Sequence, residues 1–234
     1  MRKDCSDNAY TDIQKLRFDS GSDHNFSVII TLITLTVHEV SHGYAAYKLG
    51  DPTARNFGRL SLNPLKHLDP IGTVSMLLFG FGWAKPVPIN TRYFKKPRRD
   101  MALSALAGPA SNLIMSFFSC FFLLLCAKFI PGTLGSFSGI VIQLLYSFLY
   151  YFFRLNLMLA VFNLLPFPPL DGSRIFLTFL PPKYYFGIMK YEQYISIAIM
   201  LLLLSGAFSG VLSAASDAIA SCFIGFWRLL PIFG

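Results

Sequence analysis

The sequence predicts an all-α polytopic membrane protein with about four to six transmembrane helices. The chain has 234 residues, of which 54% are hydrophobic and 24 are phenylalanine, and its mean hydropathy is +0.53. Several apolar stretches approach or exceed the roughly 20 residues that a helix needs to cross a bilayer. The basic residues are concentrated in one long connection, as they are in the cytoplasmic loops of membrane proteins.

The first apolar stretch, residues 26–49, contains a cluster of three ionisable side chains near its middle. It reads FSVIITLITLTVHEVSHGYAAYKL, and at about 1.5 Å per residue it is long enough to cross a hydrocarbon core of about 30 Å. His38, Glu39 and His42 then fall near the membrane midplane, where an ionisable side chain costs roughly 2.5 to 3.5 kcal/mol. Three such residues call for a compensating partner, and a metal ion would be one.

Three further apolar stretches are long enough to span the membrane. They are residues 101–129, 139–165 and 194–212. The second of these contains Arg154, for which we expect a structural role, such as facing the bundle interior or reaching toward the membrane surface.

Two weaker segments are too short, or too interrupted, to predict as spans. Residues 71–83 are short, and glycine, Asp217 and Arg228 interrupt residues 214–233. We expect a re-entrant loop from the first segment and an interfacial or short membrane helix from the second. We therefore expect a polar N-terminal tail over residues 1–25, followed by one membrane-embedded domain over residues 26–234.

The connection over residues 50–100 predicts the topology. The net charge is +8, and nine of the twenty basic residues lie between Asp51 and Asp100. The positive-inside rule accounts for this charge as a cytoplasmic loop, so we expect no nucleic-acid partner. The first helix then runs inward, the polar tail lies outside, and the loop over residues 166–192 faces the cytoplasm. We expect a multi-pass protein of the plasma (inner) membrane with its active site toward the cytoplasmic side.

The segment HEVSH, residues 38–42, has the spacing of a metal site. His38 and His42 lie one helical turn apart on one face, where both imidazoles reach one zinc ion at about 2.0 to 2.1 Å. Glu39 lies beside them as a general base for a water molecule. The alternative is a buried hydrogen-bonded cluster without metal.

A catalytic zinc site needs a third protein ligand. Asp171 is our candidate, because it follows the third, inward-running helix in the proline-rich loop PFPPLDGSR, which can fold back toward the helix bundle. The alternative for Asp171 is a helix cap or turn residue. His67 and Asp69 are further candidate ligands, although their loop looks like ordered turn structure.

Three motifs, in this order along the chain, resemble those of the site-2 protease family of intramembrane zinc metalloproteases. They are HEVSH at residues 38–42, GPASN at residues 108–112 and NLLPFPPLDG at residues 163–172. GDPTARNFGRLSLNPLKHLDPIG and FGWAKPVPIN further resemble the compact bacterial and archaeal branch of the family, and the sequence suggests no PDZ or CBS domain.

The resemblance implies one zinc ion per chain, bound by His38, His42 and Asp171, with Glu39 as the catalytic glutamate. A side-chain amide can donate to the oxyanion of the tetrahedral intermediate, and Asn163 and Asn112 are the candidates. The alternative for each asparagine is an interhelical hydrogen bond.

A helical substrate must unwind before it can be cleaved, and an extended substrate can pair with a strand of the enzyme. The alternating residues 54–64 and the loop after Gly82 predict such short β-hairpin elements next to the active site.

The sequence thus predicts an intramembrane zinc metalloendopeptidase that cleaves single-span membrane proteins in a lipid bilayer, in regulated intramembrane proteolysis or in the clearance of membrane remnants. A zinc carrier is the alternative, although it has no need of Glu39 next to its first ligand. An inactive relative acting as a membrane adaptor is disfavoured, because the ligand set is complete. The oligomeric state and the identity of the substrate do not follow from the sequence.

Overall fold

The computed structural model is mostly helical. It describes residues 23–69, 72, 74, 85–129, 137–181, 183, 187, 188 and 190–233, and within these residues it contains no strand. The helices are α2 (Asp23–Lys48), α3 (Thr53–Asn56), α5 (Pro97–Phe129), α6 (Phe137–Asn163), α7 (Asp171–Leu177), α9 (Glu192–Leu204) and α10 (Ser209–Trp227). Short 3-10 turns are η1 (Pro64–Lys66), η2 (Thr91–Tyr93) and η4 (Pro231–Phe233).

Three of the described helices are long and apolar enough to cross a membrane. They are α5, α6 and α10, and the first two lie where the sequence predicts spans. Helix α2 has 26 residues, but His38, Glu39 and His42 interrupt its apolar run, and it is not one of the three. A larger number of spans, up to the six expected, stays a prediction.

The single span predicted over residues 194–212 is wrong, because this stretch is divided between two helices. Helix α9 ends at Leu204 and α10 begins at Ser209. Gly206 has a φ of 76°, and Ala207 N donates to Leu202 O at 3.4 Å, which is the pattern of a Schellman helix end. Helix α10 therefore takes up most of the segment for which we expected an interfacial or short helix.

The strand or hairpin predicted over residues 54–64 is also wrong. Residues 53–56 form α3, and residues 59–63 belong to no strand. Asp51 Oδ1 accepts hydrogen bonds from Thr53 N at 2.9 Å and from the Thr53 hydroxyl, so a side chain starts the helical turn. Gly58, with a φ of 64°, ends it. Most of the predicted re-entrant segment, residues 71–83, lies outside the described residues.

Of the described residues, 23–31, 113–129, 137–158 and 211–233 form one compact unit. Its buried core consists of Cys120, Leu123, Leu124, Tyr146, Phe153, Leu157, Ala220 and Ile224. Trp227 Nε1 donates to Phe117 O at 2.9 Å, and Arg154 NH1 lies 2.7 Å from Asp217 Oδ1. This ion pair between α6 and α10 agrees with the structural role expected of Arg154.

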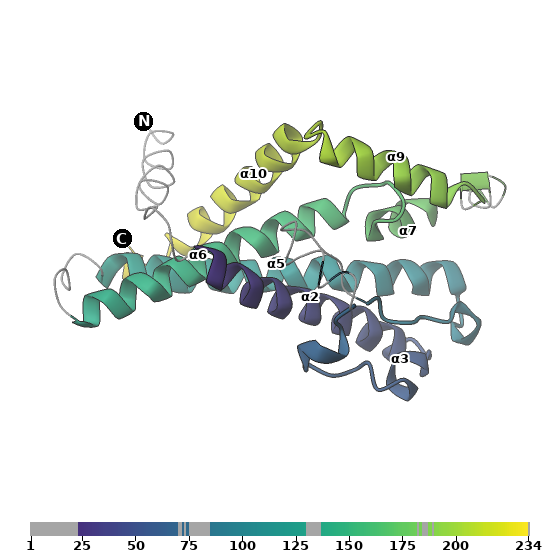
Figure 1. Ribbon diagram of the computed structural model, residues 1–234, viewed down its shortest axis with the longest axis horizontal. Coiled ribbons are helices and arrows are strands. Elements are labelled where there is room, and N and C mark those ends of the chain that lie inside the picture. Colours follow the sequence, from purple (N-terminus) through teal and green to yellow (C-terminus); the bar gives the residue numbers. More distant parts are fainter. Residues whose placement is uncertain are drawn as a thin grey trace. The chain divides into compact units, whose positions relative to one another are not determined.

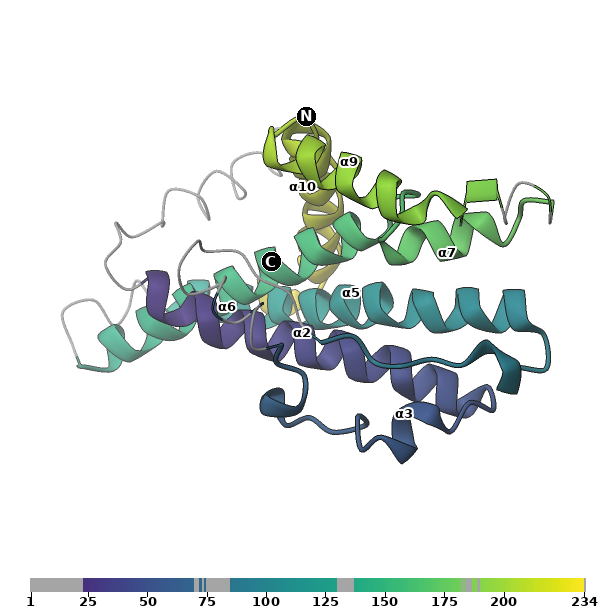
Figure 2. The same cartoon turned by 45° about the vertical axis from the view of Figure 1, so that its right-hand side comes forward.

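The second unit consists of residues 32–112 and 159–210. In it, α2 and α5 lie side by side, and α3 follows α2 (Figure 1). Helix α7 lies beside α9 (Figure 2). The extended residues 85–90 are tied to this unit, because Asn90 N donates to the buried Asp51 at 2.7 Å and Arg59 NH2 donates to Lys85 O at 2.6 Å.

We expect Arg154→Met to lower the thermal unfolding midpoint of the detergent-solubilised protein, because Asp217 then loses a cationic partner in an apolar setting. Breaking a fully buried pair costs about 3 to 5 kcal/mol, and because Arg154 and Asp217 are 28% and 40% exposed, we expect a smaller loss here. The double variant Arg154→Met/Asp217→Leu should recover part of the loss. Lys128→Met is the matched control, since Lys128 is exposed and donates only to a backbone carbonyl, that of Ile232. An Arg154→Met protein as stable as this control would contradict the role.

Candidate metal centre and active site

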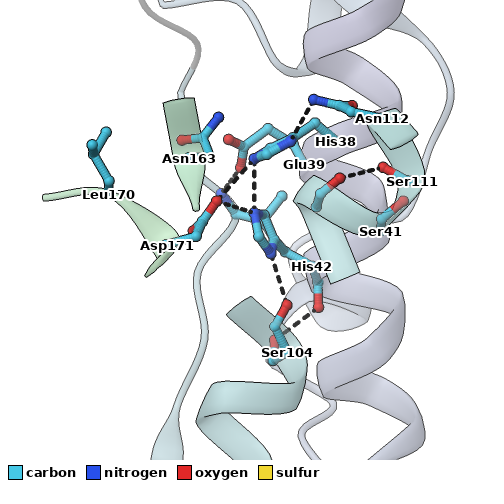
Figure 3. Close-up of polar contacts among 12 residues, drawn as sticks. His38, Glu39, Ser41, His42, Ser104, Ser111, Asn112, Asn163, Leu170 and Asp171 are labelled. Carbon is cyan, nitrogen blue, oxygen red and sulfur yellow. Dashed lines mark hydrogen bonds and ion pairs between the residues drawn. The ribbon is translucent and has the colours of Figure 1, made fainter. Parts of the chain in front are cut away.

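Helix α5 contacts both histidines of α2 from one face (Figure 3). His42 Nδ1 donates to Ser104 O at 2.8 Å, and Ser104 Oγ donates to His42 O at 3.1 Å. The side-chain nitrogen of Asn112 lies 3.1 Å from His38 Nδ1. Because Ser104, Gly108 and Asn112 are spaced four residues apart, they form one stripe along α5.

Gly108 lies at the middle of this stripe, directly against the two imidazoles. A Cβ atom at Gly108 would lie 2.4 Å from His42 Nε2 and 2.7 Å from His38 Cε1. These separations are far below a carbon–nitrogen or carbon–carbon contact, so only glycine allows α5 to approach so closely. Both rings are buried, with His38 4% and His42 7% exposed.

Asp171 is brought to the histidines by the turn between α6 and α7. Its neighbour Gly172 packs on the end of α6, because a Cβ there would lie 2.4 Å from Leu164 O. Asp171 Oδ2 lies 3.1 Å from His38 Nε2 and 3.2 Å from His42 Nε2. Burial alone would raise the pKa of Asp171, but hydrogen bonds donated by the His38 and His42 Nε2 atoms, when these carry protons, lower the pKa to about 2. The carboxyl group is therefore ionised at neutral pH.

The donor set fits a zinc ion. The Nε2 atoms of His38 and His42 are 3.0 Å apart, and they lie within 4.8 Å of a carboxylate oxygen of Asp171. Because His42 Nδ1 faces a carbonyl, the neutral ring carries its proton there, and its Nε2 is then an acceptor. Such acceptors repel one another unless a proton or a cation lies between them. Two imidazoles and one carboxylate are a ligand set of catalytic zinc sites.

A cavity of about 360 Å³ opens on these residues. Its wall is formed by His38, Glu39, His42, Pro86, Val87, Ile89, Met101, Ala105, Asn163, Pro169, Asp171 and Arg174. Glu39 Oε2 accepts a hydrogen bond from Val87 N at 2.9 Å, which holds the carboxylate at the wall. The two asparagines differ in position, since Asn163 lies in this wall and Asn112 is completely buried beside His38.

Most of the site residues predicted from the sequence line one cavity. His38, Glu39, His42, Asn163 and Asp171 all line the cavity, and Asn163 Nδ2 also donates to Leu159 O at 3.0 Å.

The two further candidate ligands have other partners. His67 Nε2 donates to Ser61 O at 2.8 Å, and Asp69 Oδ1 accepts from Gly72 N at 2.9 Å. Among the described residues, the group that could hold a metal contains neither of them.

Sequence reasoning missed Ser104 and Val87 as contributors to the site, and it noted Gly108 in the GPASN motif without its close contact with the histidines. The spacing of four residues between Ser104, Gly108 and Asn112 was a usable signal for the first two. Val87 offered none, since it contributes a backbone N–H.

The comparison with protein families decides the kind of site this is. Residues 26–206 match the model of Peptidase family M50. The chain belongs to peptidase family M50, the site-2 protease family. "Putative zinc metalloprotease YwhC" of Bacillus subtilis (strain 168) is 43% identical over 209 residues, which cover 88% of this chain and 94% of that protein. "Zinc metalloprotease MJ0392" of Methanocaldococcus jannaschii is 28% identical over 162 residues, covering 69% of this chain and 36% of that protein. No solved structure matches the chain.

This M50 peptidase is a membrane zinc metalloprotease with zinc as its cofactor. Family membership and the relatives named as zinc metalloproteases support the activity, and the cluster of His38, His42 and Asp171 agrees with the metal. The apolar helices α5, α6 and α10 agree with a lipid bilayer environment. Membership of a peptidase family favours the protease over the zinc carrier.

We expect Gly108→Ala to weaken zinc binding by at least about 10- to 100-fold, which is the range seen when the surroundings of a ligand are altered. The added methyl group must push His38 and His42 aside. Zinc content after dialysis against a chelator measures the effect. Gly225→Ala in α10 is the matched control, because nothing lies within 4 Å of a Cβ there. Equal zinc retention in the two variants would contradict the close approach.

Proposed function

We propose that this M50 peptidase is an intramembrane endopeptidase in which His38, His42 and Asp171 hold the zinc and Glu39 is the general base. One observation carries the proposal: residues 133 positions apart in the sequence place their ligand atoms at one point of a cavity. Glu39 forms part of the same wall. Each of the three ionisable residues in the polar cluster of α2, His38, Glu39 and His42, thus has a proposed role.

Glu39 moves the protons of the reaction. When bound, zinc supplies a Lewis acid for the scissile carbonyl and lowers the pKa of a water molecule toward about 7. Glu39 takes a proton from the attacking water and passes it to the leaving amine. The hydrogen bond from Val87 N to Glu39 Oε2 restricts the rotation of the carboxylate and so keeps it directed at the cavity.

Asn163 is the residue we propose as the amide donor to the oxyanion. It lines the same cavity as Glu39 and Asp171, with which it is drawn in Figure 3. Its Nδ2 has two hydrogens, of which one is donated to Leu159 O, so a second donor is left for substrate. The alternative remains that this amide only stabilises the end of α6.

The substrates we propose are single-span membrane proteins that unwind locally at the cavity. The described part of the loop after Gly82 is poorly suited to pair with a substrate strand. Pro86 and Pro88 have no N–H, and the N–H groups of Lys85, Val87 and Asn90 already donate within the protein.

We also propose a plasma-membrane location with the cavity toward the cytoplasm. The basic residues between Asp51 and Asp100 support this orientation through the positive-inside rule. They flank the described segment 85–90, which forms part of the cavity wall.

We expect the detergent-purified wild type to contain about one zinc ion per chain and Asp171→Ala to contain almost none, because a catalytic zinc site has only three protein ligands to lose. Elemental analysis after gel filtration measures the ratio. Asp69→Ala serves as the matched control, because it removes a carboxylate that accepts from Gly72 N instead. Full zinc in Asp171→Ala would overturn the proposed ligand set.

We expect Glu39→Gln to lose at least about 10²- to 10⁴-fold in peptide cleavage, the contribution of a general base, while it keeps its zinc. The glutamine oxygen still accepts from Val87 N, so the fold of the site is retained. Cleavage of fluorescein-labelled casein in detergent, measured beside zinc content, separates the two effects. Cleavage by Glu39→Gln at the wild-type rate would rule out this mechanism.

A further inference from the structure

We propose that Asn112 is a positioning residue that fixes the tautomer and orientation of His38 by accepting its Nδ1–H. The inference rests on the proposed ligand set, because it concerns how His38 presents Nε2. It gives Asn112 a different task from the oxyanion contact that the sequence suggested.

The side-chain amide of Asn112 is in contact with one ring nitrogen of His38. The amide nitrogen lies 3.1 Å from His38 Nδ1, while Nε2 of the same ring points at Asp171. Asn112 is 0% exposed, and its Oδ1 atom is buried with no hydrogen-bond partner among the described residues. A buried amide oxygen without a partner costs free energy and calls for an explanation.

The chemistry of a metal ligand indicates which of the two amide atoms faces His38. For Nε2 of His38 to bind zinc, its lone pair must be free, so the ring proton sits on Nδ1. A proton on Nδ1 needs an acceptor, and an amide nitrogen is not one. The oxygen and nitrogen of an asparagine side chain have nearly the same shape and are assigned from their partners. A half-turn of the Asn112 amide therefore brings Oδ1 to the Nδ1–H of His38.

The arrangement at His42 supports this assignment. His42 donates its Nδ1–H to Ser104 O at 2.8 Å. In the proposed state, the Nδ1–H of each imidazole therefore donates to an oxygen atom of α5. Ser104 and Asn112 lie two helical turns apart, on either side of Gly108, which leaves room for both rings. One stripe of α5 would thus orient both histidine ligands.

The position of Asn112 also argues against contact with substrate. It is absent from the residues that line the cavity, whereas Asn163 is among them. Since no surface of Asn112 is exposed, its amide acts through His38.

The test compares Asn112→Leu with Asn112→Asp in the full-length, detergent-solubilised protein. Leucine removes the acceptor at similar volume, and we expect zinc affinity to fall about 10- to 100-fold, measured by competition with a chromophoric chelator. A carboxylate accepts from Nδ1–H as the amide oxygen does, so Asn112→Asp should bind zinc within a few-fold of wild type. Asn156→Leu is the matched control, because it removes another completely buried asparagine, whose Nδ2 donates to Phe152 O.

Cobalt(II) substitution adds a readout that a merely structural role would not move. The visible absorption bands of bound cobalt should shift in Asn112→Leu and return toward wild type in Asn112→Asp, since they report the ligand field of His38. If Asn112→Leu does not fold, as judged by thermal unfolding in excess chelator, Asn112→Ala replaces it in the comparison.

Two results would overturn the inference while leaving the ligand set intact. One is wild-type zinc affinity and cobalt absorption in Asn112→Leu, and the other is an Asn112→Asp variant that binds as weakly as Asn112→Leu. Zinc retained at full affinity by His38→Ala would instead show that the proposed ligand set is wrong, and the inference would fall with it.

Discussion

The meeting of three hydrogen-bond acceptors in a buried place is the constraint on which the rest of this unit depends. Two imidazole nitrogens and a carboxylate oxygen lie within 4.8 Å of one another, and such groups do not pack together without a positive charge between them. The surrounding structure is arranged to hold them there. Helix α5 approaches α2 at a glycine, and the turn after α6 approaches its own helix end at Gly172.

The remaining polar groups of the unit are satisfied in ways that reinforce this arrangement. Ser104 exchanges two hydrogen bonds with His42, one in each direction. Asp51 ties the start of α3 to the extended residues 85–90, and those residues in turn hold Glu39. The proposed ligands, the proposed base and the cavity wall are therefore linked through main-chain contacts as well as side chains, which keeps such a site rigid.

Much of the candidate site was accessible from the sequence because its chemistry is carried by unusual side chains in apolar surroundings. His38, Glu39, His42 and Asp171 stood out for that reason, and the structure brings them to one cavity. Long apolar runs likewise revealed α5 and α6. The break at Gly206 was missed because a hydropathy pattern does not report a left-handed backbone conformation. The hairpin failed because the Asp51 side chain initiates a helical turn where residue alternation indicated a strand.

The hydrogen bond from Val87 to Glu39 has a consequence for how freely this enzyme can vary. Its donor is a peptide N–H, which every residue except proline possesses. The side chain at position 87 can therefore be exchanged while this donor to Glu39 is retained, although Val87 is itself buried, lines the cavity and packs against Gly43. This contact of the proposed base thus depends on the course of the backbone, and a comparison of residue identities alone would overlook it.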